Sequence, residues 1–375
     1  MKKQTIAVLF GGHSPEYGVS LQSAYSVLRA IDCEKYEPLP VGITRGGEWY
    51  LFSGDIEKIK DDSWHNGADC TKAAISPDRV TRGLLVFESA TGASSVRVLR
   101  LDGCFPVLHG QNGEDGTVQG LCELAGIPLI GSGALASALC MDKDKAKKIA
   151  ASVGVAVPHS FVFKQKSDIP VHGRGVCLNS QNDSADMAQY IAQVTKLGYP
   201  LFVKPVRAGS SYGISKIMDA SGLPAALALA ARYDEEIIIE EGVAGFEIGC
   251  AVLGNDELIV GELDEIELAG GFFDHDEKYS LATSAIHVPA RISTEKAAKA
   301  KEMAKAIYRA LGLKGFARVD MFFTPSGEIV FNEVNTIPGL TAHSRYPEML
   351  KAIGLSFAEV VGRVITLGLG IGEHT

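Results

Sequence analysis

Several features that would place this chain in a membrane or outside the cell are missing from its sequence. Its seven cysteines are scattered without a C-x-x-C pair, which argues against a disulfide framework and against a metal cluster. No apolar run approaches the roughly 18 residues of a membrane span. The apolar stretch Ile6–Phe10 is shorter than the core of a signal peptide, which needs about 7–15 residues. We therefore expect a cytoplasmic protein with reduced thiols and no membrane partner.

Positive charge is also scarce. The chain has 36 lysines and arginines against 45 aspartates and glutamates, and this net charge of -9 argues against nucleic acid as a main partner. No G-x-G-x-x-G motif follows the first apolar run, which speaks against a nicotinamide oxidoreductase. With 46% hydrophobic and 22% charged residues, the 375-residue chain has the composition of a globular protein of two or three domains.

The first third of the chain alternates short apolar runs, loops and helical patterns. Ile6–Phe10 and Phe105–Leu108 predict buried strands, because both are short apolar runs followed by glycine-containing loops. Helical patterns follow them at Val19–Ile31 and Thr117–Ala125. This alternation is typical of a parallel α/β domain whose active loops lie at the carboxyl ends of the strands.

Further along, changes of composition indicate three domains. A lysine-rich helix is predicted at Asp142–Ser152, and the polar residues 164–186 resemble a surface insertion. Strands are predicted at Leu201–Val206 and Glu235–Glu241. We expect an N-terminal α/β domain, a central domain and a C-terminal α/β domain, at residues 1–138, 139–242 and 243–375.

A predicted hairpin near the end of the chain gathers polar side chains. Strand-like segments at Ala317–Phe323 and Glu328–Asn335 flank the turn residues 324–327. If Phe323 faces Glu328, Arg318 faces Glu333 and Asp320 faces Phe331. Because strand side chains alternate between faces, one set of residues then shares a face and another set the opposite face. The first set is Arg318, Asp320, Glu333 and Asn335, and the second is Val319, Met321 and Val330.

Two interpretations of the polar face are open at this point. Two carboxylates and an amide oxygen on one rigid face suit magnesium, which takes oxygen ligands and substrate phosphates. Alternatively, the face is merely solvated, with a cross-strand pair between Arg318 and Glu333.

A lysine and a glycine–serine loop favour the first interpretation. Lys204 ends a predicted strand just before the loop 207–213, whose backbone N–H groups could wrap phosphates. The loop does not match the Walker pattern G-x-x-x-x-G-K-[ST], and alone it would be an ordinary turn. Lys143 upstream and the acids Glu240 and Glu247 downstream make a nucleotide site the better interpretation.

Taken in order, these motifs resemble the ATP-grasp ligases, and specifically the D-alanine–D-alanine ligase family. They cover nearly the whole chain. The motifs are Gly11-Gly12-x-Ser14-x-Glu16-x-x-Val19-Ser20, His109-Gly-x-x-Gly-Glu-Asp-Gly116, Met141-Asp142-Lys143, Lys204-Pro205 with Gly209-Ser210-Ser211, Glu277-Lys278-Tyr279, and Arg318 through Asn335-Thr336 to Pro338-Gly339.

The resemblance implies an ATP-grasp fold with a preceding parallel-sheet domain and a central lid domain. It also implies that ATP phosphorylates the carboxylate of a first D-alanine. The amine of a second D-amino acid then attacks this acylphosphate, as in peptidoglycan precursor synthesis. ATP, two magnesium ions for which manganese could substitute, and a homodimer are implied as well.

Roles for individual residues follow from the same resemblance. Asp320, Glu333 and Asn335 match the magnesium ligands. The nucleotide contacts match Lys143, Lys204, Ser211, Glu240, Val243 and Glu247, with the two lysines on the phosphates and Glu247 on the ribose. The residues around the reacting groups match Glu16, His109, Ser210, Lys278, Tyr279, Arg318 and Gly339.

Several of these matches carry a specific task. Glu16 would hold the first D-alanine ammonium, and His109 would lie near its carboxylate. Ser210 and Tyr279 would tie mobile loops to Glu16, and Lys278 would reach the transferring phosphate. Arg318 and the backbone N–H of Gly339 would stabilise the developing negative charge. Closure of loops 209–213 and 270–282 should protect the acylphosphate from water.

The pocket for the second substrate departs from the usual pattern of the family. Phe273 stands where the common D-alanine–D-alanine ligases carry tyrosine, and Arg345 stands where they carry an apolar residue. Both changes resemble the vancomycin-resistance ligases of the D-alanine–D-serine type. Asp264 and Ser344 are further candidates for this pocket. Selectivity for D-serine requires a polar group that binds its side-chain hydroxyl, because an apolar pocket discriminates between serine and alanine only about 10²-fold. The alternative is that Arg345 only pairs with a nearby carboxylate.

D-serine is therefore the favoured second substrate, and D-alanine, as in a housekeeping ligase, remains an alternative. D-lactate is less favoured because the chain keeps Lys278 and Tyr279, although His275 lies in the same loop. Two other classes compete with a ligase. A nicotinamide oxidoreductase would need the missing glycine motif, and a non-catalytic nucleotide-binding regulator would be expected to have lost the ligands that this chain retains.

Overall fold

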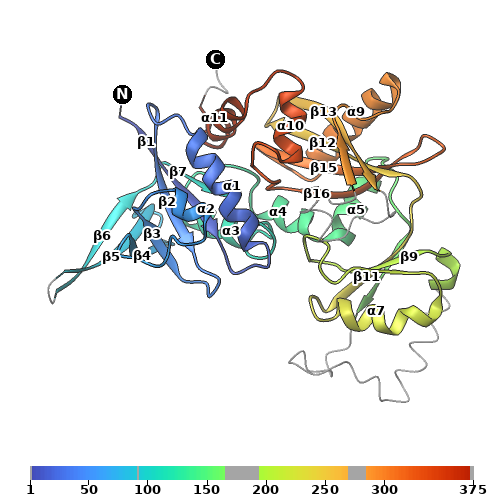
Figure 1. Ribbon diagram of the computed structural model, residues 1–375, viewed down its shortest axis with the longest axis horizontal. Coiled ribbons are helices and arrows are strands. Elements are labelled where there is room, and N and C mark those ends of the chain that lie inside the picture. Colours follow the sequence, from blue (N-terminus) through green and yellow to red (C-terminus); the bar gives the residue numbers. More distant parts are fainter. Residues whose placement is uncertain (1, 91–92, 165–193, 269–283, 372–375) are drawn as a thin grey trace.

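The computed structural model describes residues 2–90, 93–164, 194–268 and 284–371, whose strands form three sheets (Figure 1). Within these ranges, none of the helices combines the length and the apolar composition that crossing a bilayer requires. Some predicted features lie outside the described residues. These are most of the insertion at 164–186, the lid at 270–282, and Phe273, His275, Lys278 and Tyr279.

The first sheet consists of seven strands: β1 (Gln4–Gly11), β2 (Tyr36–Ile43), β3 (Trp49–Phe52), β4 (Cys70–Ile75), β5 (Gly83–Ala90), β6 (Ala93–Arg100) and β7 (Gly103–Pro106). Their order is β6-β5-β4-β3-β2-β1-β7 (Figure 1). β1 pairs in parallel with β2 and β7, as the alternating pattern predicts. The strands from β2 to β6 pair antiparallel, an extension that needs only short turns and no crossover helix. The sheet is therefore mixed and not parallel throughout.

The helices of this part are α1 (Tyr17–Ala30), α2 (Glu57–Lys60) and α3 (Thr117–Ala125). The predicted range of α3 is confirmed, and α1 begins two residues before the predicted start. Gly116 and Gly126 flank α3 in the left-handed conformation, which glycine adopts without strain. These glycines explain why its ends are visible in the sequence.

The second sheet is antiparallel and has four strands in the order β10-β9-β11-β8, namely β10 (Ser215–Ile217), β9 (Leu201–Pro205), β11 (Glu236–Glu241) and β8 (Ser160–Lys164). The predicted strands at 201–206 and 235–241 match β9 and β11 to within one residue at each end. A short helix η1 (Ala220–Gly222) and α7 (Leu223–Ala230) follow β10, and α7 contributes buried apolar residues to the core of this sheet.

The third sheet has five antiparallel strands in the order β14-β13-β12-β15-β16, namely β14 (Ser284–His287), β13 (Leu258–Leu268), β12 (Phe246–Gly254), β15 (Phe316–Phe323) and β16 (Ile329–Asn335). The accompanying helices are α4 (Ala134–Met141), α5 (Lys143–Ser152), α9 (Thr294–Ala310), α10 (Arg345–Lys351) and α11 (Phe357–Gly368). Ile248 and Cys250 of β12 belong to the same core as α9, whereas Ala251 belongs to the core that contains α10. The two helices therefore cover opposite faces of this sheet.

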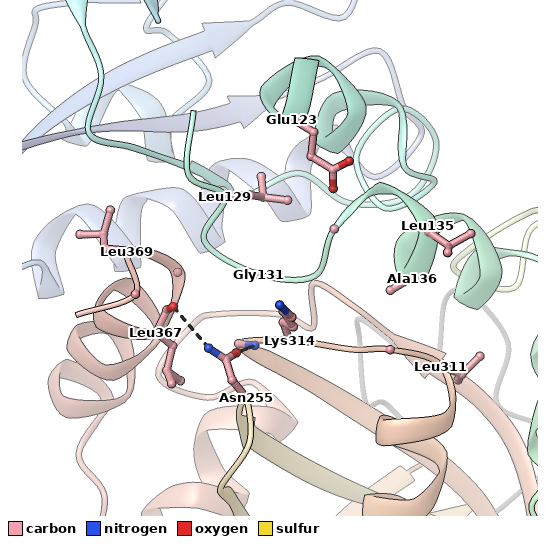
Figure 2. A pocket seen from close by; sticks show the side chains of 15 residues that line it. Glu123, Leu129, Gly131, Leu135, Ala136, Asn255, Leu311, Lys314, Leu367 and Leu369 are labelled. Carbon is pink, nitrogen blue, oxygen red and sulfur yellow. Dashed lines mark hydrogen bonds between the residues drawn. The ribbon is translucent and has the colours of Figure 1, made fainter. Parts of the chain in front are cut away.

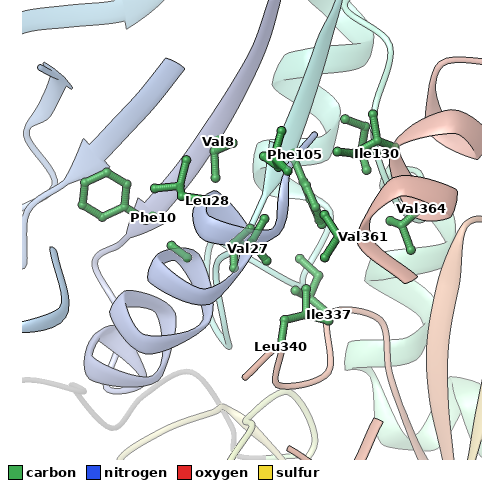
Figure 3. Packing of buried hydrophobic residues seen from close by; sticks show 14 of the residues in the cluster. Val8, Phe10, Val27, Leu28, Phe105, Ile130, Ile337, Leu340, Val361 and Val364 are labelled. Atoms are coloured by element: carbon green, nitrogen blue, oxygen red, sulfur yellow. The ribbon is translucent and has the colours of Figure 1, made fainter. Parts of the chain in front are cut away.

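A buried apolar core joins the first and last parts of the chain (Figure 3). Val27 of α1 and Phe105 of β7 are fully buried in the same cluster as Val361 of α11. The cluster also contains Ile337 and Leu340 from the loop between β16 and α10. This loop is thereby held beside the N-terminal sheet, although more than 200 residues separate it from β7 in the sequence.

The proposed domain boundaries remain predictions. The division between residues 138 and 139 falls within α4, and the division between 242 and 243 falls between β11 and β12. The described cysteines are free thiols, of which Cys104, Cys122, Cys140 and Cys250 are buried.

Candidate active site

The hairpin of β15 and β16 pairs differently from the predicted register. Arg318 lies opposite Asn335, and Asp320 lies opposite Glu333. Met321 then faces Phe331, so one additional residue of β16 forms a bulge. The predicted pairs of Arg318 with Glu333 and of Asp320 with Phe331 are therefore wrong. The register already differs by one residue at the turn, where Phe323 faces Ile329 and not Glu328, and the bulge then adds a second shift. Neither shift leaves a mark in the local pattern.

The predicted polar face survives this correction. Arg318, Asp320, Glu333 and Asn335 are paired with one another, so they share one face. The opposite face carries Val319 and Met321, as expected, and both are fully buried. Val330 was placed with them by the sequence, but it lies opposite Phe322 because the bulge reverses the alternation.

A row of acidic residues crosses the third sheet on this face. Asp264 of β13 lies opposite Gly249 of β12, and Gly249 lies opposite Asp320 of β15. Glu333 of β16 continues the row. The other face packs against α9, so these carboxylates point towards the side that α10 covers.

Asp320 is held firmly by its neighbours. Its exposed fraction is 1%, and Arg318 donates to its two carboxylate oxygens, with Nε–Oδ1 and Nη2–Oδ2 distances of 2.8 Å. The amide nitrogen of Asn335 donates to Oδ2 over 2.8 Å. Burial would lower the pKa of Arg318, but the charge of Asp320 outweighs this effect and raises it. Arg318 therefore stays positively charged at neutral pH.

The donor set on this face fits magnesium. Among the described residues, no group of three or more histidines, cysteines, aspartates and glutamates could hold a metal ion. The candidate set contains only two carboxylates, Asp320 and Glu333, together with the amide of Asn335. Such a set of oxygens suits a magnesium ion that takes its remaining ligands from substrate phosphates and water.

The nucleotide residues predicted from the sequence come together in one cleft between the second and third sheets. All six of them line it: Lys143, Lys204, Ser211, Glu240, Val243 and Glu247. Glu333 lines the same cleft, so the candidate metal face opens into it. Phe202, Phe246 and Phe322 supply apolar walls. These aromatics could not be assigned from the sequence, because an aromatic residue in a strand gives the same pattern whether it lines a cleft or fills a core.

A buried trio of charges forms one wall of the cleft. Glu240 is 2% exposed, and its Oε2 accepts a hydrogen bond from Lys204 Nζ over 2.7 Å. Its other oxygen is bound by Lys147, which is 3% exposed. Burial alone would raise the pKa of Glu240, but the two lysines hold it at about 2. Glu240 therefore stays ionised and fixes Lys204 at the cleft.

Lys147 was not identified from the sequence, although a signal was present. It lies four residues after Lys143 in the lysine-rich helix α5, and residues at this spacing share one helix face. Lys143 Nζ donates to the carbonyl oxygen of Ala208 over 2.6 Å and lies 3.8 Å from a carboxylate oxygen of Glu333. The helix thus supplies one lysine to the cleft and another to its supporting wall.

A smaller cavity adjoins the cleft and shares Lys143 and Glu333 with it. Glu16, Ser210 and Asn335 line this cavity. The hydroxyl of Ser210 donates to Glu16, across 194 positions of the sequence. Ser210 and Ser211 have positive φ angles of 47° and 60°, which serine rarely adopts. Such strain is common where a loop serves a ligand, and it supports a functional role for this one.

His109 is buried and lines another cavity, together with Gly11 and Gly12. Its Nε2 lies 3.1 Å from the hydroxyl oxygen of Ser23. Burial lowers its pKa to about 4, so its imidazole is neutral at pH 7. His109 lies where its predicted loop begins, and its contact with substrate stays a prediction.

Glu114 belongs to the motif His109–Gly116, but its role was not predicted from the sequence. Its carboxylate accepts hydrogen bonds of 3.0 Å from the N–H groups of Gly110 and Ile337. It also lines the small cavity with Glu16. Burial, and then the charge of Glu16, raise its pKa to about 8. Glu114 thereby joins the loop after β7 to the loop after β16.

The predicted second-substrate residues are bound to one another. Arg345 forms two hydrogen bonds with Asp264, with Nε–Oδ2 and Nη2–Oδ1 distances of 2.6 and 2.8 Å. Asp264 is fully buried. Arg345 therefore pairs with a carboxylate, as one interpretation of the sequence required, while its role in the second-substrate pocket stays a prediction. Ser344 lies 2.8 Å from the hydroxyl oxygen of Thr341 and beside Gly339.

A separate cavity of about 580 Å³ contains none of the predicted site residues (Figure 2). It lies between the loop of residues 129–133 and the end of α11. Figure 2 shows Glu123 and Lys314 on opposite walls, with leucine side chains around them. The nucleotide candidates line the cleft, and Glu16 and Ser210 line its small neighbour, so this separate cavity has no part in the predicted site.

Comparison with known proteins gives a consistent result. A family model described as "D-ala D-ala ligase N-terminus" matches residues 5–132, and one described as "D-ala D-ala ligase C-terminus" matches residues 163–366. A Streptomyces coelicolor protein provisionally named D-alanine–D-lactate ligase is 45% identical, over 98% of this chain and 99% of its own. The D-alanine–D-alanine ligase of Caldicellulosiruptor bescii is 40% identical, over 98% and 96%.

Among solved structures, the VanG D-Ala:D-Ser ligase from Enterococcus faecalis is similar over 98% of this chain and 100% of its own. The two chains are 50% identical, and the TM-score is 0.85.

Proposed function

Because this chain belongs to the D-alanine–D-alanine ligase family, we propose that it is an ATP-dependent ligase that joins D-alanine to D-serine. One observation supports the site most strongly. The cleft that holds all six nucleotide candidates shares Lys143 and Glu333 with the cavity that contains Glu16 and Ser210. A nucleotide phosphate in the cleft would therefore be adjacent to an amino acid in the cavity.

The residues of the two cavities suit the two steps of the reaction. Lys143 and Lys204 neutralise phosphate charge, which is the main requirement of phosphoryl transfer. Magnesium, held by Asp320, Glu333 and Asn335, would supply further neutralising charge. Glu16 holds the ammonium group of the first D-alanine. A carboxylate oxygen of this D-alanine attacks the terminal phosphorus of ATP, and ADP leaves.

In the second step, the amine of the second amino acid attacks the acyl carbon and phosphate leaves. Arg318 lies beside Asp320 and stabilises the negative charge that develops on the acyl oxygen, together with the N–H of Gly339. The bond between Ser210 and Glu16 keeps the loop after β9 over the small cavity, which limits access of water to the acylphosphate.

The choice of D-serine is drawn from sequence similarity and from the polar second pocket. The solved D-Ala:D-Ser ligase is 50% identical, against 45% and 40% for the relatives named for D-lactate and D-alanine. Asp264 of β13 fixes the guanidinium of Arg345 at the start of α10, and this guanidinium is the polar group that would bind the hydroxyl of D-serine. We also propose a cytoplasmic homodimer that makes peptidoglycan precursors of the vancomycin-resistance type.

Product analysis tests this function directly. The protein would be incubated with ATP, magnesium, D-alanine and equimolar D-serine and D-lactate, and the products resolved by mass. We expect D-Ala–D-Ser to dominate. A dominant D-Ala–D-Ala or D-Ala–D-lactate product would refute the preference for serine. No product with any second substrate would refute the ligase itself, and a Lys204→Met variant provides the inactive control.

Replacing Ser210 by alanine should weaken the contact between the loop after β9 and Glu16. We expect the KM for the first D-alanine to rise about tenfold, because a hydrogen bond to a charged group contributes about 1.5–3 kcal/mol. The thermal midpoint should change little, since Ser210 is only partly buried. Steady-state kinetics with D-alanine as the varied substrate would measure this. An unchanged KM would show that the bond does not position Glu16.

A further inference from the structure

Arg345 lies in a slot that crosses the third sheet above Gly249. Gly249 stands between Asp264 and Asp320 on neighbouring strands. A Cβ atom at Gly249 would lie 2.5 Å from Arg345 Nη2 and 2.6 Å from Asp264 Oδ1, both too close for real atoms. The missing side chain of this glycine therefore provides the space that the guanidinium occupies.

One carboxylate anchors the guanidinium in this slot. Asp264 is fully buried and binds Nε and Nη2 of Arg345, while its Oδ1 also accepts the N–H of Gly249 over 2.7 Å. Burial would lower the pKa of Arg345, but Asp264, and after it Asp320, raise it well above its usual value. The anchored group is therefore a permanent cation.

From this anchored position, Arg345 reaches two further carboxylates with different proposed tasks. Its Nη1 donates to Glu247 Oε1 over 2.8 Å, and Glu247 lines the nucleotide cleft. Its Nη2 lies 3.5 Å from Oδ1 of Asp320. An arginine that served only the second amino acid would need neither contact.

We propose that Arg345 is a positioning residue that sets Glu247 relative to Asp320 and thereby couples nucleotide binding to phosphoryl transfer. This inference rests on the proposed function, since it takes Glu247 as a nucleotide contact and Asp320 as a ligand of the magnesium ion that accompanies the phosphates. The physical reason is that phosphoryl transfer depends mainly on position and charge. A cation that bridges two carboxylates fixes both at once.

A double variant, Asp264→Asn with Arg345→Met, tests the proposal without leaving a buried carboxylate unpaired. Removing both charges is often tolerated, whereas removing one partner of a buried pair is strongly destabilising. We expect ADP to bind about tenfold more weakly by isothermal titration calorimetry, with no amino acid present. A change of less than twofold would overturn the coupling. Circular dichroism and the thermal midpoint would confirm that the variant is folded.

Gly249→Ala provides a second test that keeps every charge. Its added methyl group should push the guanidinium out of the slot, so we expect a similar loss of ADP affinity. Gly362→Ala is the matched control, because a Cβ there meets nothing within 4 Å. Arg291→Met is the control for loss of an arginine, since Arg291 pairs with Glu265, the neighbour of Asp264 in β13.

Turnover measurements separate this inference from the proposed function. In the double variant and in Gly249→Ala, we expect the KM for ATP to rise and kcat to fall, while the KM for the first D-alanine stays unchanged. Variants that bind ADP normally and lose only their preference for D-serine would show that Arg345 serves the second substrate alone. Wild-type protein that forms no dipeptide would refute the proposed function, whereas the ADP-binding comparison would still test the position of Glu247.

Discussion

Replacing Glu333 by alanine is expected to lower the rate of dipeptide formation at least about 10²–10³-fold, the loss typical of removing one group that stabilises charge in a transition state. Glu333 lies opposite Asp320 and lines both cavities. Its side chain is 24% exposed, so its removal should cost the fold little. Asp320 is a less suitable target, because it is buried against Arg318 and its loss would disturb folding as well as chemistry.

A coupled assay of ADP release, repeated over a range of magnesium concentrations, would measure the effect of Glu333→Ala. The rate should recover only in part at high magnesium, since a ligand is missing and not merely weakened. Glu328→Ala is the control, because Glu328 is an exposed acid in the same hairpin. Nearly normal turnover at saturating magnesium would exclude Glu333 as a ligand.

The second large effect is expected on stability. Glu240→Gln should lower the free energy of unfolding by about 3–5 kcal/mol, the cost of breaking a buried ion pair by removing one partner. Lys147 and Lys204 would remain buried beside each other without their shared counter-ion. Urea denaturation would measure the loss. Adding Lys147→Met to the variant should recover part of it, because only one lysine then lacks a partner.

The pH dependence of this loss is fixed by the pKa of Glu240. Its folded pKa of about 2 lies below the usual 4.5, so the ionised carboxylate stabilises the fold at neutral pH. That contribution is lost as the pH falls from 4.5 towards 2, and the difference between wild type and Glu240→Gln should shrink over this range. Glu236→Gln, at a partly exposed pair with Lys164, should cost less than about 1 kcal/mol at any pH. Equal losses in both variants would contradict the buried-network account.

Local signals account for the parts of the fold that were predictable. The range of α3 follows from flanking glycines, and β9 and β11 are apolar runs with clear ends. The antiparallel strands β3 to β6 were not predicted, because antiparallel strands are joined by short turns and lack the helical pattern that indicates parallel strands. The bulge in β16 was missed for a similar reason. The alternation of apolar and polar residues describes a single strand, whereas a bulge is defined by how that strand pairs with its neighbour.

The same distinction between local patterns and long-range pairing applies to the candidate site. The six nucleotide candidates were found through ordered motifs, and all of them line one cleft. The specific contacts within the site were not predicted, because they join segments that are distant in the sequence. Glu114 meets the N–H of Ile337 across 223 positions, and Arg345 meets Asp264 across 81. A sequence shows which side chains carry charge, but the pairing of charges depends on how segments far apart pack together.

The slot above Gly249 places a restriction on how this protein can change over time. Any side chain at position 249 would collide with the guanidinium of Arg345, and without an arginine at 345 the space at 249 would be an unfilled void beside a buried carboxylate. Neither a larger residue at position 249 nor the loss of arginine at position 345 is therefore expected to persist without the other change. Across relatives, positions 249 and 345 should therefore vary together: arginine at 345 with glycine at 249, and a larger residue at 249 where 345 is not arginine.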